Sequence, residues 1–334
     1  MKHRKLFALL TLFACMVAMS AVFAACGDDE EEGADTGAET TAQTQEGSGT
    51  EIQRNDANAS TTITVGSKNF TEQKVLGEVY AQALEAAGYR VRKSLDLGDE
   101  KTAQRALKQG EIDGYPEYTG TALLSLCGVG TDDIPKDPAL AFDETKKCFA
   151  KDKLTAFPPT PFTSSNEVAV TQETAERLDL QTISDLKGKD QDLTLYGSPE
   201  CRQRTDCLLG LQQTYGLKFK KFTPVAIDLR HEVLKRGDDV VSIVFTTDPQ
   251  NKREKLVLLE DDQGMFPPYN STFVVRDEVA EQAGADLPKV IEQVQKGLTD
   301  EVMQELNARV DLDRESPQAV AAAYLQESKL VGGS

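Results

Sequence analysis

Along most of the chain, short apolar runs alternate with segments whose apolar residues recur every three or four positions. The run at 63–65 leads through Gly66 and Ser67 into a segment, 75–84, with the spacing of an amphipathic helix. Ser316 and Pro317 form an N-cap and first-turn pair for a helix through residue 325. Further strand-like runs lie at 168–171, 193–196, 240–245, 256–259 and 272–275. This alternation predicts an α/β fold with largely parallel sheets.

Two parts of the chain resemble each other. Residues 107–113 (LKQGEID) are similar to residues 234–240 (LKRGDDV), and the same offset places Tyr118 opposite Phe245. A looser similarity sets 63–67 beside 193–198, each a strand followed by a Gly-Ser turn. Chance is one explanation, because Lys-x-Gly turns are common. The other is a pair of similar α/β lobes, each with an aromatic residue at the carboxyl end of a strand, where ligands bind in open α/β sheets.

The first 26 residues have the pattern of a secretory leader. Lys2, Arg4 and Lys5 precede an apolar run from 6 to 23, and the run ends at FAAC, which resembles a bacterial lipobox with Cys26 as the lipidated residue. A simple signal peptide cut after Ala25, or a retained membrane anchor, are the alternatives. We expect residues 1–26 to be a lipoprotein signal peptide.

Residues 27–61 read as a disordered acidic tether. The segment is rich in Gly, Ala, Thr, Gln and acidic residues and has almost no large apolar residue, so it cannot bury enough surface to offset its ordering entropy. The expected product is an extracytoplasmic protein that is anchored to the cell membrane at its N-terminus.

Composition excludes several classes of function. The chain carries 37 Lys and Arg against 55 Asp and Glu, a net charge of −18, which disfavours nucleic acid as a partner. It has two His, of which His3 lies in the leader, so His231 alone is available to the folded part. A catalytic triad or a two-His metal site is therefore disfavoured, and we expect neither a metal nor a cofactor nor enzyme activity.

Several motifs resemble one known family. These are GSKNFTEQ at 66–73, GEID at 110–113, YPEYTGT at 115–121, GSPE at 197–200, TTD at 246–248 and PPY at 267–269. Together, over roughly residues 62–330, they resemble the substrate-binding lipoproteins of osmoprotectant ABC transporters for glycine betaine, choline and carnitine (ProX/OpuC-type, OpuAC-like). The resemblance implies a two-lobed periplasmic-binding-protein fold (type II-like) with a ligand cleft. Lobe 1 would be 62–163 plus 270–330, and lobe 2 would be 164–269, joined by hinge crossovers near 158–166 and 266–270.

The resemblance also implies a cage of aromatic rings for a quaternary ammonium group. Such a group has no N–H donor and is held by ring faces. Tyr118 and Tyr269 match cage tyrosines, Phe245 stands where a third Tyr is usual, and Asn166 stands where a fourth is expected. The amide puts plain glycine betaine in doubt and favours a larger or more polar zwitterion. Tyr118 and Phe245 have the alternative role of core aromatics.

The matched positions for a ligand carboxylate are Lys68, Thr121 and Arg204. Arg204 lies near Asp206 and Glu200, so a surface ion pair is the alternative to ligand contact for this residue. For Lys68 the alternative is a solvated side chain.

Four cysteines remain outside the leader and the lipobox: Cys127, Cys148, Cys201 and Cys207. An even number in an exported chain favours disulfides, although four Cys allow three connectivities. Pairing of neighbours keeps each bridge within one lobe and leaves the lobes free to close.

These observations predict a monomeric receptor that captures a zwitterionic or cationic solute by cleft closure and delivers it to ABC permease subunits. A receptor for another polar zwitterion or an amino-acid derivative is the alternative within the same class. An enzyme on the same fold would need Glu117 or Asp248 as a general acid facing the cleft. A structural surface lipoprotein would have an apolar or filled cleft.

Overall fold

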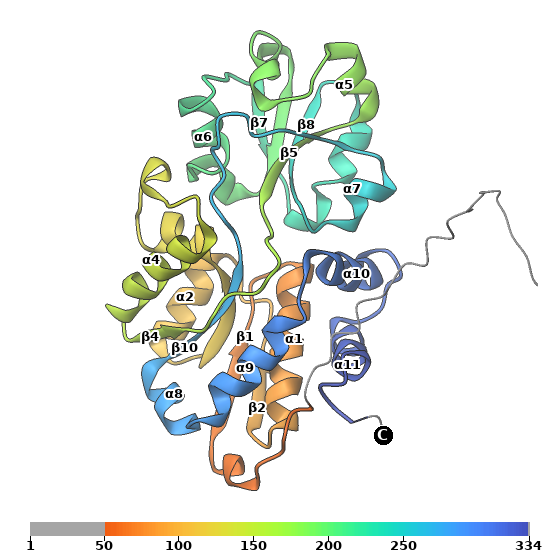
Figure 1. Ribbon diagram of the computed structural model, residues 1–334. Helices are drawn as coiled ribbons and strands as arrows, with labels where there is room; N and C mark the ends of the chain where they lie inside the picture. The colour runs from red at the N-terminus through yellow and green to blue at the C-terminus, as the bar shows by residue number, and fades with distance from the viewer. Residues whose placement is uncertain (1–50, 333–334) are drawn as a thin grey trace, which may run out of the picture. The chain divides into compact units, whose positions relative to one another are not determined.

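A computed structural model describes residues 51–332. Within them, two five-stranded sheets are each flanked by helices (Figure 1). The leader 1–26, with Cys26, and residues 27–50 of the predicted tether lie outside the described residues. No helix among residues 51–332 combines the length and apolarity needed to cross a membrane.

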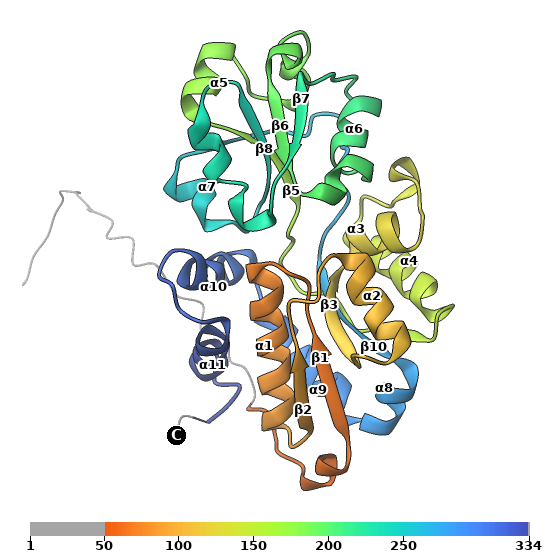
Figure 2. The same ribbon diagram turned by 180° about the vertical axis from the view of Figure 1, so that it is seen from behind.

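The first sheet has the order β2 (Arg90–Ser94), β1 (Thr62–Gly66), β3 (Gly114–Tyr118), β10 (Ser271–Arg276) and β4 (Leu154–Ala156). One face is covered by α1 and α9, with α11 packed beside α1, and the other face by α2 and α4 (Figures 1 and 2). We call this sheet and its helices the first lobe. Its helices are α1 (Thr71–Ala86), α2 (Glu100–Gln109), α3 (Thr119–Thr121), α4 (Pro138–Ala150), α8 (Asp277–Ala283), α9 (Asp286–Lys296), α10 (Asp300–Asp311) and α11 (Pro317–Glu327).

The second sheet has the order β7 (Lys221–Pro224), β6 (Thr194–Gly197), β8 (Val240–Phe245), β5 (Asn166–Val170) and β9 (Val257–Leu259). We call this sheet and its flanking segments the second lobe. Its helices are α5 (Gln172–Leu178), α6 (Leu208–Gln213) and α7 (Pro249–Arg253).

The two sheets share one topology, which confirms that the internal similarity is structural. β1, β2 and β3 occupy the same places in the first sheet as β6, β7 and β8 in the second. Tyr118 ends β3 and Phe245 ends β8, as their common offset predicted. The predicted helix near the C-terminus is also present as α11. Ser316 is its N-cap, as predicted, and accepts a hydrogen bond from the Ala319 amide.

The prediction of largely parallel sheets is only half right. β1 pairs in parallel with β2 and β3, and β6 with β7 and β8. β10 and β5, in contrast, run antiparallel to their neighbours. Each of them follows a segment that arrives from the other lobe. It therefore enters its sheet at the edge where the parallel strands end, so that Ser271 pairs with Tyr118 and Asn166 with Phe245.

The two segments that connect the lobes lie side by side. Thr163 and Asn270 form an isolated antiparallel bridge, and the Ser164 amide donates to the Tyr269 carbonyl over 3.1 Å. α10 adds a further contact, since Asn307 donates to the carbonyl of Thr247, in the second lobe, over 3.2 Å.

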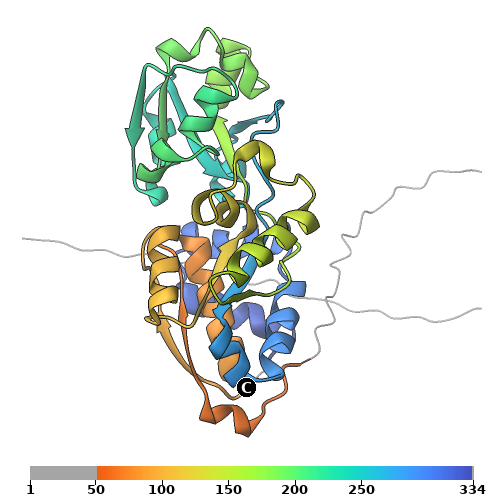
Figure 3. The same ribbon diagram turned by 90° about the vertical axis from the view of Figure 1, so that its left-hand side faces the viewer.

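The predicted tether extends too far toward the C-terminus. Residues 51–61 are ordered against the first lobe and include a 3-10 helix, Asp56–Ser60, at the end of that lobe remote from the second (Figure 3). Ile52 is buried in the main core of the first lobe, and the Asn55 amide donates to the Ala87 carbonyl. For residues 51–61 the prediction of disorder is wrong, because one apolar side chain and a few backbone hydrogen bonds were enough to order the segment.

Glu167, next to the first connecting segment, gives the stability of the protein a pH dependence. Burial, reinforced by the charge of Asp261, raises the pKa of Glu167 from 4.5 to about 7. Between these two pH values the folded protein binds more protons here than the unfolded chain does. The contribution of Glu167 to the unfolding free energy therefore falls as the pH rises from about 4.5 to about 7.

We expect Glu167→Gln to be more stable than the wild type at pH 8, by about 1–3 kcal/mol. The advantage should disappear near pH 4.5. Urea unfolding at a series of pH values measures it, with Glu173→Gln on the exposed face of α5 as the control. An advantage that is the same at both pH values would show that Glu167 is not protonated in the folded protein at neutral pH.

Candidate functional site

A pocket of about 80 Å³ lies where the strand ends of the two lobes face each other. Its wall includes residues that follow β1, end β3 and begin α2 in the first lobe, and residues from the ends of β6 and β8 in the second. The structure places all the residues predicted to contact ligand on this wall: Lys68, Tyr118, Thr121, Asn166, Arg204, Phe245 and Tyr269.

Aromatic rings form a continuous part of the wall. Phe70, which precedes α1, has its ring centroid 6.3 Å from that of Tyr118 and 5.5 Å from that of Phe245. The ring thus links a strand end of the first lobe to a strand end of the second. Sequence reasoning missed Phe70, although its position inside the GSKNFTEQ block was an available signal.

Lys68 is buried rather than solvated, and its charge is already paired. Its side chain is 4% exposed and its ammonium forms an ion pair with Glu117, which is fully buried. The ammonium also lies 4.5 Å from the centroid of the Tyr118 ring, in cation–π geometry. Lys68 therefore presents less positive charge to the pocket than a free lysine would.

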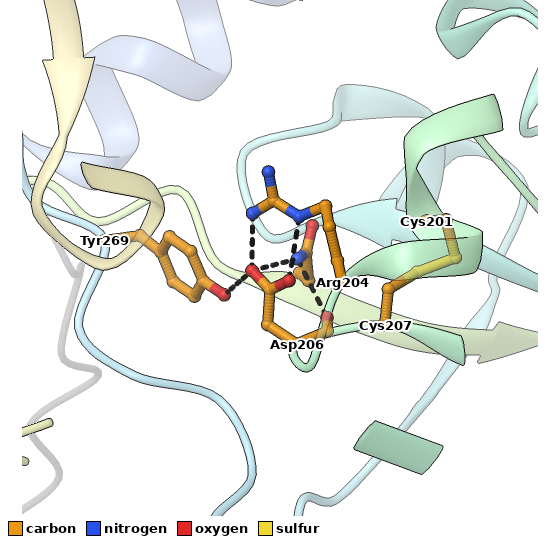
Figure 4. Close-up of a disulfide and its surroundings, with 6 residues drawn as sticks. Cys201, Arg204, Asp206, Cys207 and Tyr269 are labelled. Carbon is orange, nitrogen blue, oxygen red and sulfur yellow. Dashed lines mark hydrogen bonds and ion pairs between the residues drawn. A yellow bond between two sulfur atoms is a disulfide. The ribbon is translucent and has the colours of Figure 1, made fainter. Parts of the chain in front are cut away.

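Asp206 organises the wall on the second lobe (Figure 4). Its buried carboxylate accepts hydrogen bonds from Nε and Nη2 of Arg204 and from the hydroxyl of Tyr269. The amide of Asn166 donates to the Asp206 carbonyl over 3.1 Å and to the carboxylate over 3.2 Å. Three of the predicted contact residues are thus held in place by a residue that was considered only as an ion-pair partner of Arg204.

The electrostatics of this cluster favour its charged form. Burial by itself would raise the pKa of Asp206, but the charge of Arg204 and its hydrogen bonds, together with the Tyr269 hydroxyl, hold that pKa below its usual value. Burial would lower the pKa of Arg204, and the neighbouring Asp206 and Glu100 instead hold it well above the ordinary range. Burial and the charge of Asp206 raise the pKa of Tyr269, which therefore stays protonated and donates.

The alternative prediction for Arg204 was a surface ion pair. Arg204 does form ion pairs, but they lie at the pocket rather than on the surface. Its Nη1 atom donates over 2.9 Å to Glu100, the first residue of α2 in the first lobe. Nη2 lies 3.5 Å from the hydroxyl of Thr121. The predicted partner Glu200 lines the pocket, while the observed partners are Asp206 and Glu100.

Arg230 is a second arginine in the pocket lining, and the sequence analysis did not single it out. The guanidinium carbon of Arg230 lies 4.4 Å from the centroid of the Phe245 ring, and the side chain pairs with the carboxylate of Asp248. Glu117 and Asp248, the carboxylates that an enzyme would have required, are each held in a buried ion pair, and neither lines the pocket. Arg230 belongs to none of the sequence motifs, so no local pattern pointed to it.

The disulfides join neighbouring cysteines, as the preference for bridges within one lobe predicted. Cys201 is bonded to Cys207 and Cys127 to Cys148. The first bridge closes the short loop that carries Arg204 and Asp206, and both of its cysteines line the pocket (Figure 4).

A wider groove of about 610 Å³ adjoins the pocket. It is lined by residues between 124 and 130 in the first lobe and between 199 and 205 in the second, and it shares Asp99, Glu100, Glu200 and Arg204 with the pocket. Arg204 and Glu100 thus lie between the pocket and the groove.

Comparison with known proteins places this geometry in a family. Residues 61–327 match the family model OpuAC, described as the substrate-binding domain of an ABC-type glycine betaine transport system. A glycine-betaine-binding protein of Pseudomonas aeruginosa is 34% identical over 81% of this chain and 89% of its own length. The ergothioneine transport permease/ergothioneine binding protein EgtU of Helicobacter pylori is 30% identical over 79% of this chain and 47% of its own length.

A solved structure agrees in fold. The crystal structure of a glycine betaine/carnitine/choline ABC transporter matches with a TM-score of 0.65 and 26% identity, covering 79% of this chain and 98% of that one. The two-lobed fold is thereby confirmed. The chain belongs to the OpuAC family and is a substrate-binding protein of an ABC transporter, as its motifs predicted.

Proposed function

We propose that this pocket captures a small solute with a quaternary ammonium group, which the protein delivers to the permease of its transporter. The observation that carries the proposal is the set of aromatic side chains in the pocket lining: Phe70, Tyr118, Phe245 and Tyr269. A trimethylammonium group has no N–H to donate and is attracted to ring faces, each contributing about 0.5–2 kcal/mol.

The charges around the pocket support a cationic group. Lys68 and Arg230 are each neutralised by one buried carboxylate, while Arg204 is shared between Asp206 and Glu100. Glu72, which accepts from the Tyr118 hydroxyl over 2.6 Å, adds a further buried carboxylate. The resulting surplus of negative charge favours a cation within reach of the rings.

Capture would proceed by movement of the two lobes about the connecting segments. The wall is divided between residues 62–163 plus 270–330 and residues 164–269. A ligand that contacts both parts stabilises the arrangement in which they are close. The side chains that line the pocket would thus act from both sides, with Phe70 and Tyr118 facing Phe245 and Arg204.

Titration calorimetry against choline, glycine betaine, carnitine and ergothioneine tests the proposal. We expect at least one of these to bind in the pocket, and 3,3-dimethylbutan-1-ol, the uncharged analogue of choline, to bind about tenfold more weakly or worse than choline. A polar amino acid that binds while no quaternary ammonium compound does would favour the alternative receptor. Equal binding of choline and the uncharged analogue would show that the rings act only as an apolar surface.

We also propose that Cys26 carries a lipid that holds the protein at the outer face of the cytoplasmic membrane, near its permease, as a monomer. The lipobox pattern at the end of the apolar leader supports this. Cys26→Ser should move the protein from the membrane fraction to the soluble fraction and leave ligand affinity unchanged. Membrane association that survives the substitution would contradict the lipid anchor.

A further inference from the structure

The pairing of Arg204 with Glu100 bears on which solute the pocket accepts. Arg204 comes from the loop after β6, and Glu100 from the start of α2 in the opposite lobe. The exposed fraction of the Arg204 side chain is 15% and that of the Glu100 side chain is 7%, so the ion pair is largely shielded from water. Both residues line the pocket, and their contact spans it.

Every guanidinium nitrogen of Arg204 already has a partner. Nε and Nη2 hold the carboxylate of Asp206, and Nη1 holds Oε1 of Glu100 over 2.9 Å. Asp206 is fixed from other directions by Tyr269 and Asn166, whereas Glu100 stands on the first turn of a helix in the other lobe. Nη1 and Nη2 each keep a second N–H, so a carboxylate that reaches this side of the guanidinium group either replaces Glu100 or lies beside it.

We propose that Glu100 acts as an internal counter-anion for Arg204 and makes the site select quaternary ammonium solutes without a carboxylate, such as choline, over zwitterionic betaines. The inference rests on the proposed function of the pocket. A betaine carboxylate that reaches Arg204 lies beside the carboxylate of Glu100, whether or not it displaces it, and two like charges in a shielded site repel each other strongly. A cation without a carboxylate leaves the ion pair intact and gains from the surplus negative charge.

Glu100 is thus a specificity-determining residue whose side chain occupies the place of a ligand carboxylate. The wild type should bind choline more tightly than glycine betaine. Glu100→Gln keeps the size of the side chain and its ability to accept one hydrogen bond from Arg204, while it removes the competing charge. The substitution should strengthen binding of glycine betaine and weaken binding of choline, which moves the ratio of the two dissociation constants by about tenfold or more.

Glu200→Gln is the matched control. Glu200 lines the same pocket and carries the same charge, but its carboxylate is not the one bonded to Arg204. Titration calorimetry of the wild type and both variants with choline and glycine betaine measures the ratios, and the ratio for Glu200→Gln should shift clearly less than that for Glu100→Gln, because the carboxylate of Glu200 is not bonded to Arg204.

The outcomes separate this inference from the proposed function. Wild-type preference for glycine betaine over choline would overturn it, and so would an equal shift of the ratio in both variants, which would mean that only the net charge of the pocket matters. Tighter binding of glycine betaine to Glu100→Gln is a gain that partial unfolding cannot produce. If none of the three proteins binds either compound, the proposed function fails and not merely the role of Glu100.

Discussion

Glu117→Gln is expected to lower the free energy of unfolding by about 3–5 kcal/mol, because it leaves the ammonium of Lys68 buried without a counter-charge. The exposed fractions of the two side chains are 4% for Lys68 and 0% for Glu117. The carboxylate also accepts from the Tyr115 hydroxyl over 2.9 Å and from the Tyr118 amide over 2.7 Å. Urea denaturation followed by circular dichroism measures the loss.

Two control variants identify the cause of this loss of stability. Glu232→Gln breaks a solvent-exposed pair with Lys235 and should leave the unfolding free energy nearly unchanged. The double variant Lys68→Met with Glu117→Gln removes both charges and should recover a large part of the loss. A double variant as unstable as Glu117→Gln alone would show that the hydrogen bonds of Glu117, and not its charge, stabilise this part of the first lobe.

Replacing both Phe70 and Phe245 by Leu should weaken choline binding by about 1–3 kcal/mol, roughly 5- to 150-fold. Leucine keeps apolar bulk at both positions but has no ring face to attract a cation. These positions are a cleaner test than Tyr118 and Tyr269, whose hydroxyls donate to the buried carboxylates of Glu72 and Asp206.

Titration calorimetry measures the effect, and the uncharged analogue 3,3-dimethylbutan-1-ol serves as the control ligand. Its affinity should change much less than that of choline, because it depends on apolar contact. If the double Leu variant binds choline as tightly as the wild type does, Phe70 and Phe245 are core aromatics and the cage is wrongly placed.

Much of the architecture was predictable because it is repeated. The similarity of residues 107–113 to 234–240 placed Tyr118 and Phe245 at equivalent strand ends, and the sheets then proved to have one strand order. Strand ends of this kind are where α/β folds bind ligands, so the pocket followed from the repeat and the motifs together.

Other features depend on contacts between distant segments and left no local pattern. The antiparallel direction of β5 and β10 follows from the passage of the chain between lobes, which apolar periodicity does not encode. Lys68 and Arg204 were correctly placed at the pocket, but their pairing with Glu117 and Glu100 joins residues far apart in sequence. A side chain's charge can be read from the sequence, whereas its neutralisation by a partner in another element cannot.

The most direct test of the account is a crystal structure of the protein with choline. The account predicts that the ammonium nitrogen lies in the pocket, within about 6 Å of the ring centroids of Phe70 and Phe245, with the Arg204–Glu100 pair intact. A choline bound in the adjoining groove away from the rings, or with its hydroxyl end toward them, would contradict it.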